Sequence, residues 1–302
     1  MVAISALAQS PGALQNQAFP SPVATIRTRV DEVSLAFTVT DKKGRFISNL
    51  HSADFQLFDN RIAPERLTYF QQKSDLPLHV AVLIDASSSV QYRFKSEQDA
   101  AIAFLKKIVR PGTDKAFILA FNDKVIPLHD VTDRTDKLRK SIRKIKPDGN
   151  TSLNDAVIAA AETLRQIPED RLTRRAIILI SDGVDTVKRS TLQQAEHAVS
   201  RADTILFALT SNQSDRDDNS EGDAVLQQLA QSSGGSLLPA REQFMSAFRN
   251  VEKALRNQYV ISYNPAKFQA DGSYRTVEIV ARRPGLRTAC RKGYYARAHE
   301  SR

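Results

Sequence analysis

The central part of the chain, from Leu78 to about Asn257, alternates short apolar runs with amphipathic runs, and this alternation restricts the fold more than any other feature. The apolar runs have the length of strands and lie at Val80–Ile84, Ala116–Phe121, Ala176–Ile180 and Thr204–Leu209, with a shorter one around Ser236–Leu238. Strands that are apolar on both faces are typical of parallel sheets with helices packed on each side. The pattern therefore predicts an α/β fold with a doubly wound, mostly parallel sheet.

Amphipathic runs with helical spacing fill the intervals between these strands. We expect helices at Phe94–Val109, Asp136–Ile145, Leu153–Ile167, Thr191–Ala202, Asp223–Ser232 and Glu242–Arg256. Pro111-Gly112 follows the first of them and Pro168 follows the third, where proline and glycine commonly stop a helix. The repeated order of strand and helix supports the parallel sheet.

The two flanks of this central region have the period of two that is typical of strands with one buried face. In the first flank Val33, Leu35, Phe37 and Val39 alternate with their neighbours, and the Asp271-Gly272 turn precedes a similar run in the second flank. Each flank has too few strands for a stable sheet of its own. We therefore predict that segments 30–76 and 258–297 pair into a small β-sandwich, that an α/β domain at 77–257 is inserted between them, and that 298–302 is a tail.

The first 29 residues are predicted to lack a fold of their own. The apolar start ends in Ala6-Leu7-Ala8, which matches a signal-peptidase site, although the basic region and most of the apolar region of a signal peptide are missing. A spacer from Gln9 to Thr25, rich in Ser, Pro, Gln and Ala, follows. We favour a signal-peptide remnant, which predicts an extracytoplasmic protein, either periplasmic or secreted. The alternative is a frayed apolar terminus on a cytoplasmic protein.

Charge and composition exclude several classes of protein. The net charge of +9 comes from 43 Lys and Arg against 34 Asp and Glu, and much of the excess lies between Arg134 and Lys146. Leu138, Ile142 and Ile145 recur there at helical spacing, so the basic side chains are expected on a solvated face, without the aromatic residues that stack nucleic-acid bases. No stretch approaches the roughly 20 apolar residues of a membrane span. The single cysteine, Cys290, excludes an internal disulfide and a cysteine-built metal site.

Polar side chains follow the apolar run Val80–Ile84 at once, in the pattern Asp-x-Ser-x-Ser formed by Asp85, Ser87 and Ser89. Open α/β sheets bind their ligands at the carboxyl ends of the strands. Carboxylates and hydroxyls are hard oxygen donors, which suit a divalent cation such as Mg²⁺. The same residues could instead cap the turn and the helix that follow, so the pattern alone leaves both interpretations open.

Two later loops supply matching oxygen donors. Thr151 lies in the loop that leads into the helix at Leu153, and Asp182 follows the apolar run that ends at Ser181. Three loops therefore present Asp85, Ser87, Ser89, Thr151 and Asp182, which we predict to be the metal ligands. Asp185 is expected to be a turn residue and Asp155 a residue of the first helical turn, where the helix dipole favours it.

This set of five residues resembles the metal-ion-dependent adhesion site of the von Willebrand factor type A domain, and the resemblance covers roughly residues 77–257. The flanking runs Val39–Gly44 and Asp54–Asn60 look like those of bacterial, Acidobacteria-type VWFA-related proteins, usually found behind a signal peptide. The resemblance implies a Rossmann-like domain that binds Mg²⁺, or else Mn²⁺ or Ca²⁺.

The resemblance also implies the role of each ligand. Ser87 and Ser89 would bind the cation directly, and Thr151 would bind it directly or through water. Asp85 and Asp182 would act at least partly through bound waters, which leaves the cation electrophilic. An acidic side chain of a partner protein would then complete the coordination.

Two classes of function are compatible with such a site. The first is a protein-binding module for adhesion or scaffolding, without catalysis. The second is a metal-assisted hydrolase or phosphotransferase that uses the cation as a Lewis acid. The sequence has no Gly-x-Ser-x-Gly nucleophile elbow and no Gly-x-x-x-x-Gly-Lys phosphate loop, so binding is the favoured hypothesis.

Overall fold

The computed structural model of the protein describes residues 32–73, 76–168, 173–210, 220–239 and 244–296. The predicted signal-peptide remnant and spacer at 1–29 and the predicted tail at 298–302 lie outside these ranges. Within the described residues no helix is both long and apolar enough to cross a membrane.

A six-stranded sheet forms the centre of the α/β part, with the order β6-β5-β4-β7-β8-β9. Its strands are β4 (Leu78–Asp85), β5 (Lys115–Phe121), β6 (Val125–Thr132), β7 (Arg174–Ser181), β8 (Thr204–Thr210) and β9 (Leu237–Pro239). All neighbours pair in parallel except β5 and β6. Every residue of β4 is buried, as a central parallel strand requires. The predicted α/β fold with a mostly parallel sheet is confirmed.

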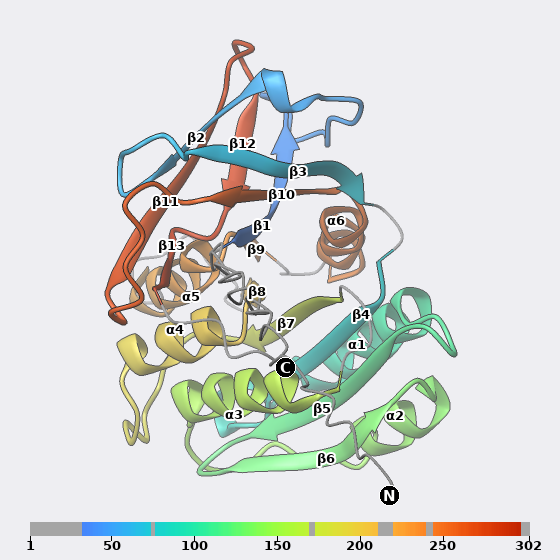
Figure 1. Cartoon of the computed structure of the whole chain (residues 1–302). Helices are drawn as coiled ribbons and strands as arrows, with labels where there is room; N and C mark the ends of the chain where they lie inside the picture. Colours follow the sequence, from blue (N-terminus) through green and yellow to red (C-terminus); the bar gives the residue numbers. More distant parts are fainter. Residues whose placement is uncertain (1–31, 74–75, 169–172, 211–219, 240–243, 297–302) are drawn as a thin grey trace, which may run out of the picture. The chain divides into compact units, whose positions relative to one another are not determined.

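Helices cover both faces of this sheet (Figure 1). The helices of one face are α1 (Phe94–Ile108), α2 (Thr135–Ile142) and α6 (Phe244–Arg256), and those of the other face are α3 (Leu153–Gln166), α4 (Leu192–Arg201) and α5 (Ser220–Ser232). The pleat of β4 divides its side chains accordingly, with Val80, Val82 and Ile84 in the first core and Ala81 and Leu83 in the second. Two separate apolar cores thus hold the sheet between its helices.

The flanks form two antiparallel sheets. One has the order β12-β1-β10-β3 and the other the order β13-β11-β2. Their strands are β1 (Val33–Thr40), β2 (Phe55–Asp59), β3 (Arg66–Lys73), β10 (Gln258–Asn264), β11 (Tyr274–Ala281), β12 (Arg287–Cys290) and β13 (Gly293–Tyr295). Because β10 pairs with both β1 and β3, the segment after the α/β part joins the segment before it. A third apolar core fills the space between the two sheets.

A buried carboxylate links the two antiparallel sheets. Asp59, at the end of β2, accepts hydrogen bonds from the hydroxyls of Tyr263 at 2.8 Å and Tyr294 at 2.6 Å, and from Nε of Arg275 at 2.6 Å. All four side chains are nearly excluded from solvent. Burial, together with the charge of Asp59, raises the pKa of the Tyr263 hydroxyl above its ordinary value. The carboxylate is thus fully paired in an apolar surrounding, which is the condition for burying a charge at tolerable cost.

The α/β part meets the flanking sheets at the amino ends of its central strands. Lys292, between β12 and β13, donates its backbone N–H to the carbonyl of Ser232 at the end of α5, at 3.1 Å. Asp203, directly before β8, forms an ion pair with Arg291. The boundaries of the inserted domain at 77 and 257 remain a prediction.

Two strands, β6 and β12, were not predicted from the sequence. β6 pairs antiparallel to β5 at the edge of the large sheet, and none of its residues is fully buried, so it lacks the apolar run that marks the other strands. The short β12 has the same half-buried character. The basic side chains around α2 agree with the prediction of a solvated face, because Leu138 and Ile142 are buried while Lys137, Arg139 and Lys140 are exposed.

Candidate metal site

The candidate site starts at Asp85, the last residue of β4. Its carboxylate is fully buried and accepts the Ser181 hydroxyl at 2.6 Å and the backbone N–H of Ser87 at 2.9 Å. Since Ser181 is the last residue of the adjacent parallel strand β7, this contact ties the carboxyl ends of β4 and β7 together. These hydrogen bonds fix the turn after β4 in position relative to β7.

The two serines of the pattern continue this chain of hydrogen bonds to the second carboxylate. The hydroxyls of Ser87 and Ser89 lie 3.0 Å apart, and the Ser89 hydroxyl donates to Asp182 at 2.7 Å. Ser87 is buried, whereas Ser89 is exposed. The structure thus brings four of the five predicted ligands into one hydrogen-bonded cluster with access to solvent at Ser89.

Thr151 belongs to a third loop, which is fastened to the other two through the backbone. Ser88 donates its N–H to the carbonyl of Gly149 at 3.1 Å on one side of the loop. On the other side Thr186 and Val187 donate to the carbonyl of Thr151 at 3.0 and 3.1 Å. The Thr151 side chain is nearly buried at the end of this loop. The loop that carries Thr151 is therefore joined by backbone hydrogen bonds to the two loops that carry the other predicted ligands.

The turn after Asp182 depends on a glycine. Gly183 has a positive φ of 89°, and a Cβ atom there would lie 2.1 Å from the carbonyl oxygen of Gly222 in α5. Only glycine allows both this backbone conformation and this close approach. The Asp-Gly pair of the sequence therefore packs the backbone after β7 closely against the start of α5.

The two other acids of these loops have local partners. Asp185 accepts the backbone N–H groups of Asn154 at 2.9 Å and Lys188 at 2.8 Å, which makes it a turn residue. Asp155, in the first turn of α3, accepts the Ser190 hydroxyl and lies 3.6 Å from the guanidinium of Arg189. Both acids thus help to fix the loops.

The electrostatics of the cluster favour a cation. Burial raises the pKa of Asp85 to about 6, against the lowering effect of its hydrogen bonds to Ser181 and Ser87, and the nearby Asp182 raises it further. Negative charge at Asp85 is therefore unfavourable unless a positive charge is supplied. Two carboxylates balance one divalent ion, and three hydroxyls add neutral oxygens of the kind that Mg²⁺ accepts. The donor set fits a hard divalent cation.

One buried carboxyl group near the cluster was not among the predicted ligands. Glu97, in the first turn of α1, is fully buried, and neither of its oxygens has a hydrogen-bond partner in the part of the chain that the structure describes. The sequence does contain a signal, because Glu97 shares a helical face with the apolar Phe94, Ala101 and Phe104. An acid on the apolar stripe of a helix indicates a special environment.

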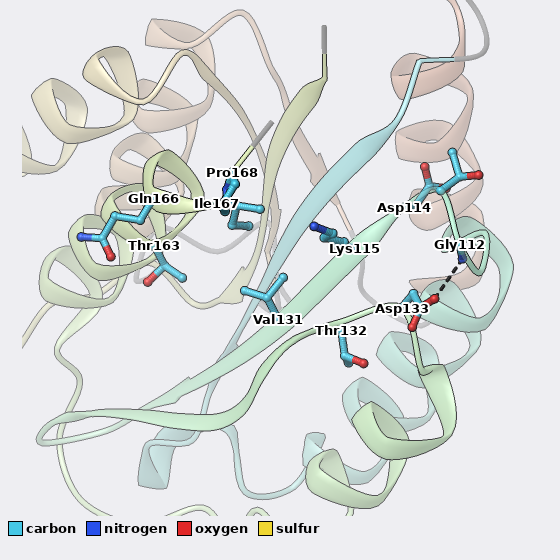
Figure 2. A pocket seen from close by; sticks show the side chains of 11 residues that line it. Gly112, Asp114, Lys115, Val131, Thr132, Asp133, Thr163, Gln166, Ile167 and Pro168 are labelled. Carbon is cyan, nitrogen blue, oxygen red and sulfur yellow. Dashed lines mark hydrogen bonds between the residues drawn. The ribbon is translucent and has the colours of Figure 1, made fainter. Parts of the chain in front are cut away.

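A separate cavity lies at the amino end of β5, at the ends of the strands opposite the candidate site. Figure 2 shows this cavity of about 610 Å³ at the amino end of β5, where Lys115, Val131 and Ile167 are among the lining residues. The backbone N–H of Gly112 donates to Asp133 at 2.9 Å on its rim. None of the five predicted ligands lines it.

Comparison with known proteins identifies the α/β part. Residues 80–184 match the family model of the von Willebrand factor type A domain, a stretch that includes all five predicted ligands. The chain contains a von Willebrand factor type A domain. This confirms the resemblance noted in the sequence, whereas the Acidobacteria-type subfamily stays a prediction. No curated protein sequence matches the chain.

Solved structures of type A domains share the fold at low sequence identity. The von Willebrand factor type A protein from Catenulispora acidiphila is 10% identical with a TM-score of 0.51, and the match covers 89% of this chain and 74% of that one. The vWF domain of the type V pili tip protein Mfa5 from Porphyromonas gingivalis is 14% identical with a TM-score of 0.50, and covers 59% and 94%. Proximal thread matrix protein 1 from the mussel byssus, with a zinc-occupied MIDAS motif, is 14% identical with a TM-score of 0.51, and covers 66% and 50%.

Proposed function

We propose that this protein is a metal-ion-dependent protein-binding module for adhesion or scaffolding, without enzymatic activity. The observation that carries the proposal is the hydrogen-bonded cluster of Asp85, Ser87, Ser89 and Asp182 at the carboxyl ends of two adjacent strands. Such a cluster gathers hard oxygen donors at the edge where open α/β sheets bind ligands. Thr151 would be the fifth ligand.

Each residue has a defined task in this proposal. Ser87, Ser89 and Thr151 supply neutral hydroxyl oxygens, while Asp85 and Asp182 supply the charge that balances the cation. When bound, Mg²⁺, or Mn²⁺ or Ca²⁺ in its place, provides an electrophilic position for an acidic side chain of a partner protein. The exposure of Ser89 supports access by such a side chain.

The proposed location is extracytoplasmic, either periplasmic or secreted. One similar structure is a pili tip protein and another is a byssus matrix protein, which supports a role outside the cytoplasm. The small-x-small pattern at Ala6-Leu7-Ala8 gives independent support. Fractionation of cells that produce the natural protein would test the location, and recovery of the protein only from the cytoplasm would contradict it.

Thermal unfolding with and without divalent cations tests the metal site. We expect Mg²⁺ or Mn²⁺ to raise the melting temperature of the wild type, since a ligand that binds only the folded state stabilises it. Ser87→Ala and Asp182→Ala should lose this increase. Ser88→Ala is the matched control, because Ser88 is exposed between the two ligand serines and its side chain is not among the predicted ligands. Equal cation responses in the wild type and both ligand variants would refute the site.

Capture of partners in Mg²⁺ and in EDTA tests the function. We expect a partner that is retained by the wild type in Mg²⁺, released by EDTA and not retained by Asp182→Ala. A screen for hydrolysis with the same proteins provides the opposite outcome. Metal-dependent turnover that both ligand variants abolish would establish an enzyme and overturn the proposal.

A further inference from the structure

Glu97 is a buried acid whose carboxyl group has no hydrogen-bond partner among the described residues. Its exposure is 0%, and both of its oxygens are unpaired. A buried polar group without a partner costs free energy of folding, and a buried charge without one costs more. The ionised form of Glu97 is therefore unfavourable unless a further group donates a hydrogen bond or carries positive charge.

The charged groups that affect Glu97 connect it to the candidate metal site. Burial raises the pKa of Glu97 to about 8; the charges of Asp85 and Asp182 raise it as well, and only Arg93 opposes them. Arg93 directly precedes α1 and lies one helical turn before Glu97. Glu97 lies in the first turn of α1, and this helix follows directly after β4 and the turn that carries Ser87 and Ser89, so the chain itself places Glu97 close to the candidate site.

The missing group must be positively charged or a hydrogen-bond donor, and small enough for a buried position. A hydrated divalent cation meets both conditions, because its waters donate hydrogen bonds while its charge attracts carboxylates. Mg²⁺ commonly keeps several waters when it binds to proteins. Within the described part of the chain, no three acidic, histidine or cysteine side chains lie close enough together to ligate one ion. This favours a contact through water over direct ligation by Glu97.

We propose that Glu97 is a positioning residue of the cation site, whose carboxylate accepts a hydrogen bond from a water bound to the cation. This inference rests on the proposed function, since it requires that the five-residue site binds a cation. When a cation is bound, its charge would favour the ionised form of Glu97, whose carboxylate would orient the bound water. Glu97 therefore sets the affinity for the cation without contacting the partner protein.

Calorimetric titration of Mg²⁺ and Mn²⁺ into the full chain tests the inference. The variant Glu97→Gln keeps the size of the side chain and removes the carboxylate. We expect its affinity for both cations to fall about tenfold or more, as is usual when a residue that supports metal ligation is changed. The melting temperature in EDTA should stay equal to that of the wild type or rise, because an unpaired buried acid has been removed.

Two further variants complete the experiment. Asp99→Asn removes an acid from the exposed face of the same helix, and it should leave the cation affinity unchanged. Glu97→Asp keeps the carboxylate but draws it back, so its affinity should lie between those of the wild type and Glu97→Gln. It also supplies the measurement if Glu97→Gln does not fold.

The outcomes separate this inference from the proposed function. Equal affinities in the wild type, Glu97→Gln and Glu97→Asp would overturn the role of Glu97 and leave the five-residue site intact. A wild type that binds neither cation would refute the site itself. A lower melting temperature of Glu97→Gln in EDTA, together with unchanged affinity, would show that Glu97 serves folding alone.

Discussion

At the scale of single residues, the cluster at the end of β4 contains a buried acid, Asp85, whose ionised form is unfavourable in the folded protein. Asp85 is held by Ser181 and Ser87, yet burial and the charge of Asp182 oppose its ionisation. In the absence of a cation, neutral pH therefore places a charge where the folded protein disfavours it. A cation bound at the proposed site would relieve this cost, so part of its binding free energy would come from the destabilised acid.

The raised pKa of Asp85 predicts a specific pH dependence of the free energy of unfolding. Its pKa is about 6 in the folded protein and 3.8 in the reference state, so the folded state retains the proton more strongly than the unfolded chain. The stabilisation from the protonated form is complete below pH 3.8 and is lost as the pH rises through about 6. The wild type in EDTA should thus lose up to about 3 kcal/mol of unfolding free energy across this window, relative to Asp85→Asn.

Urea unfolding of the wild type and Asp85→Asn in EDTA measures this difference at each pH. The comparison cancels the contributions of titrating groups that do not interact with Asp85, whereas those of Asp182 and Glu97, which do, form part of the measured difference. Saturating Mg²⁺ should flatten the difference for the wild type, because the cation stabilises the ionised form. A difference between the two proteins that does not change with pH would contradict the prediction.

At the scale of elements, the Asp59 cluster fastens the two antiparallel sheets to each other. It connects β2, β11 and β13 in one sheet with β10 in the other through Asp59, Arg275, Tyr294 and Tyr263. Asp59→Ala should cost about 3–5 kcal/mol of stability, because it leaves the buried guanidinium of Arg275 without its carboxylate. Tyr263→Phe should cost about 2 kcal/mol, since it removes one of three donors to a charged group.

Chemical denaturation that monitors the antiparallel sheets measures both effects. Asp136→Ala is a suitable control, because Asp136 pairs with Arg134 on the exposed surface of α2, and surface ion pairs contribute little. A loss for Asp59→Ala no larger than that of the control would mean that the cluster does not join the sheets.

The elements also show how far sequence patterns reach. β4 and β7 were predicted because buried parallel strands form apolar runs, and Asp85, Ser87 and Asp182 were predicted because each stands directly after such a run. β6 was missed because an edge strand with half-buried residues has no such run. Glu97 was missed for a different reason. Its environment includes the charges of Asp85 and Asp182, which come near it only in the folded protein, so spacing within the helix shows an anomaly but not its cause.

At the scale of the whole molecule, the carboxyl and amino ends of the central strands have different surroundings. The candidate site lies at the carboxyl ends of β4 and β7. The flanking sheets contact the amino ends, where Asp203 pairs with Arg291, which follows β12. At this amino edge Arg110 and Arg256 both donate to the carbonyl of Leu76, just before β4.

The carboxylate of Asp114 completes the connection at the amino edge. Asp114 is fully buried and lies 2.9 Å from Nε of Arg110 and 2.8 Å from the guanidinium of Arg256. Burial would raise its pKa, but the hydrogen bonds from Arg110 and Arg256 hold the pKa below the ordinary value. The segment just before β4 and the end of α6 therefore meet beside the ionised carboxylate of Asp114, at the ends of the strands opposite the candidate site.

This separation predicts which strands cation binding stabilises. The flanking sheets have their own apolar core, distinct from the two cores of the α/β part, so they are expected to open as a separate unit. Saturating Mg²⁺ should then slow amide hydrogen exchange in β4 and β7 of the wild type and leave β1 and β10 unchanged. Ser87→Ala should show no effect of Mg²⁺ in any of these strands. If β1 and β10 gained as much protection as β4, the chain would unfold as one cooperative unit, and the proposed boundaries at 77 and 257 would not separate independent domains.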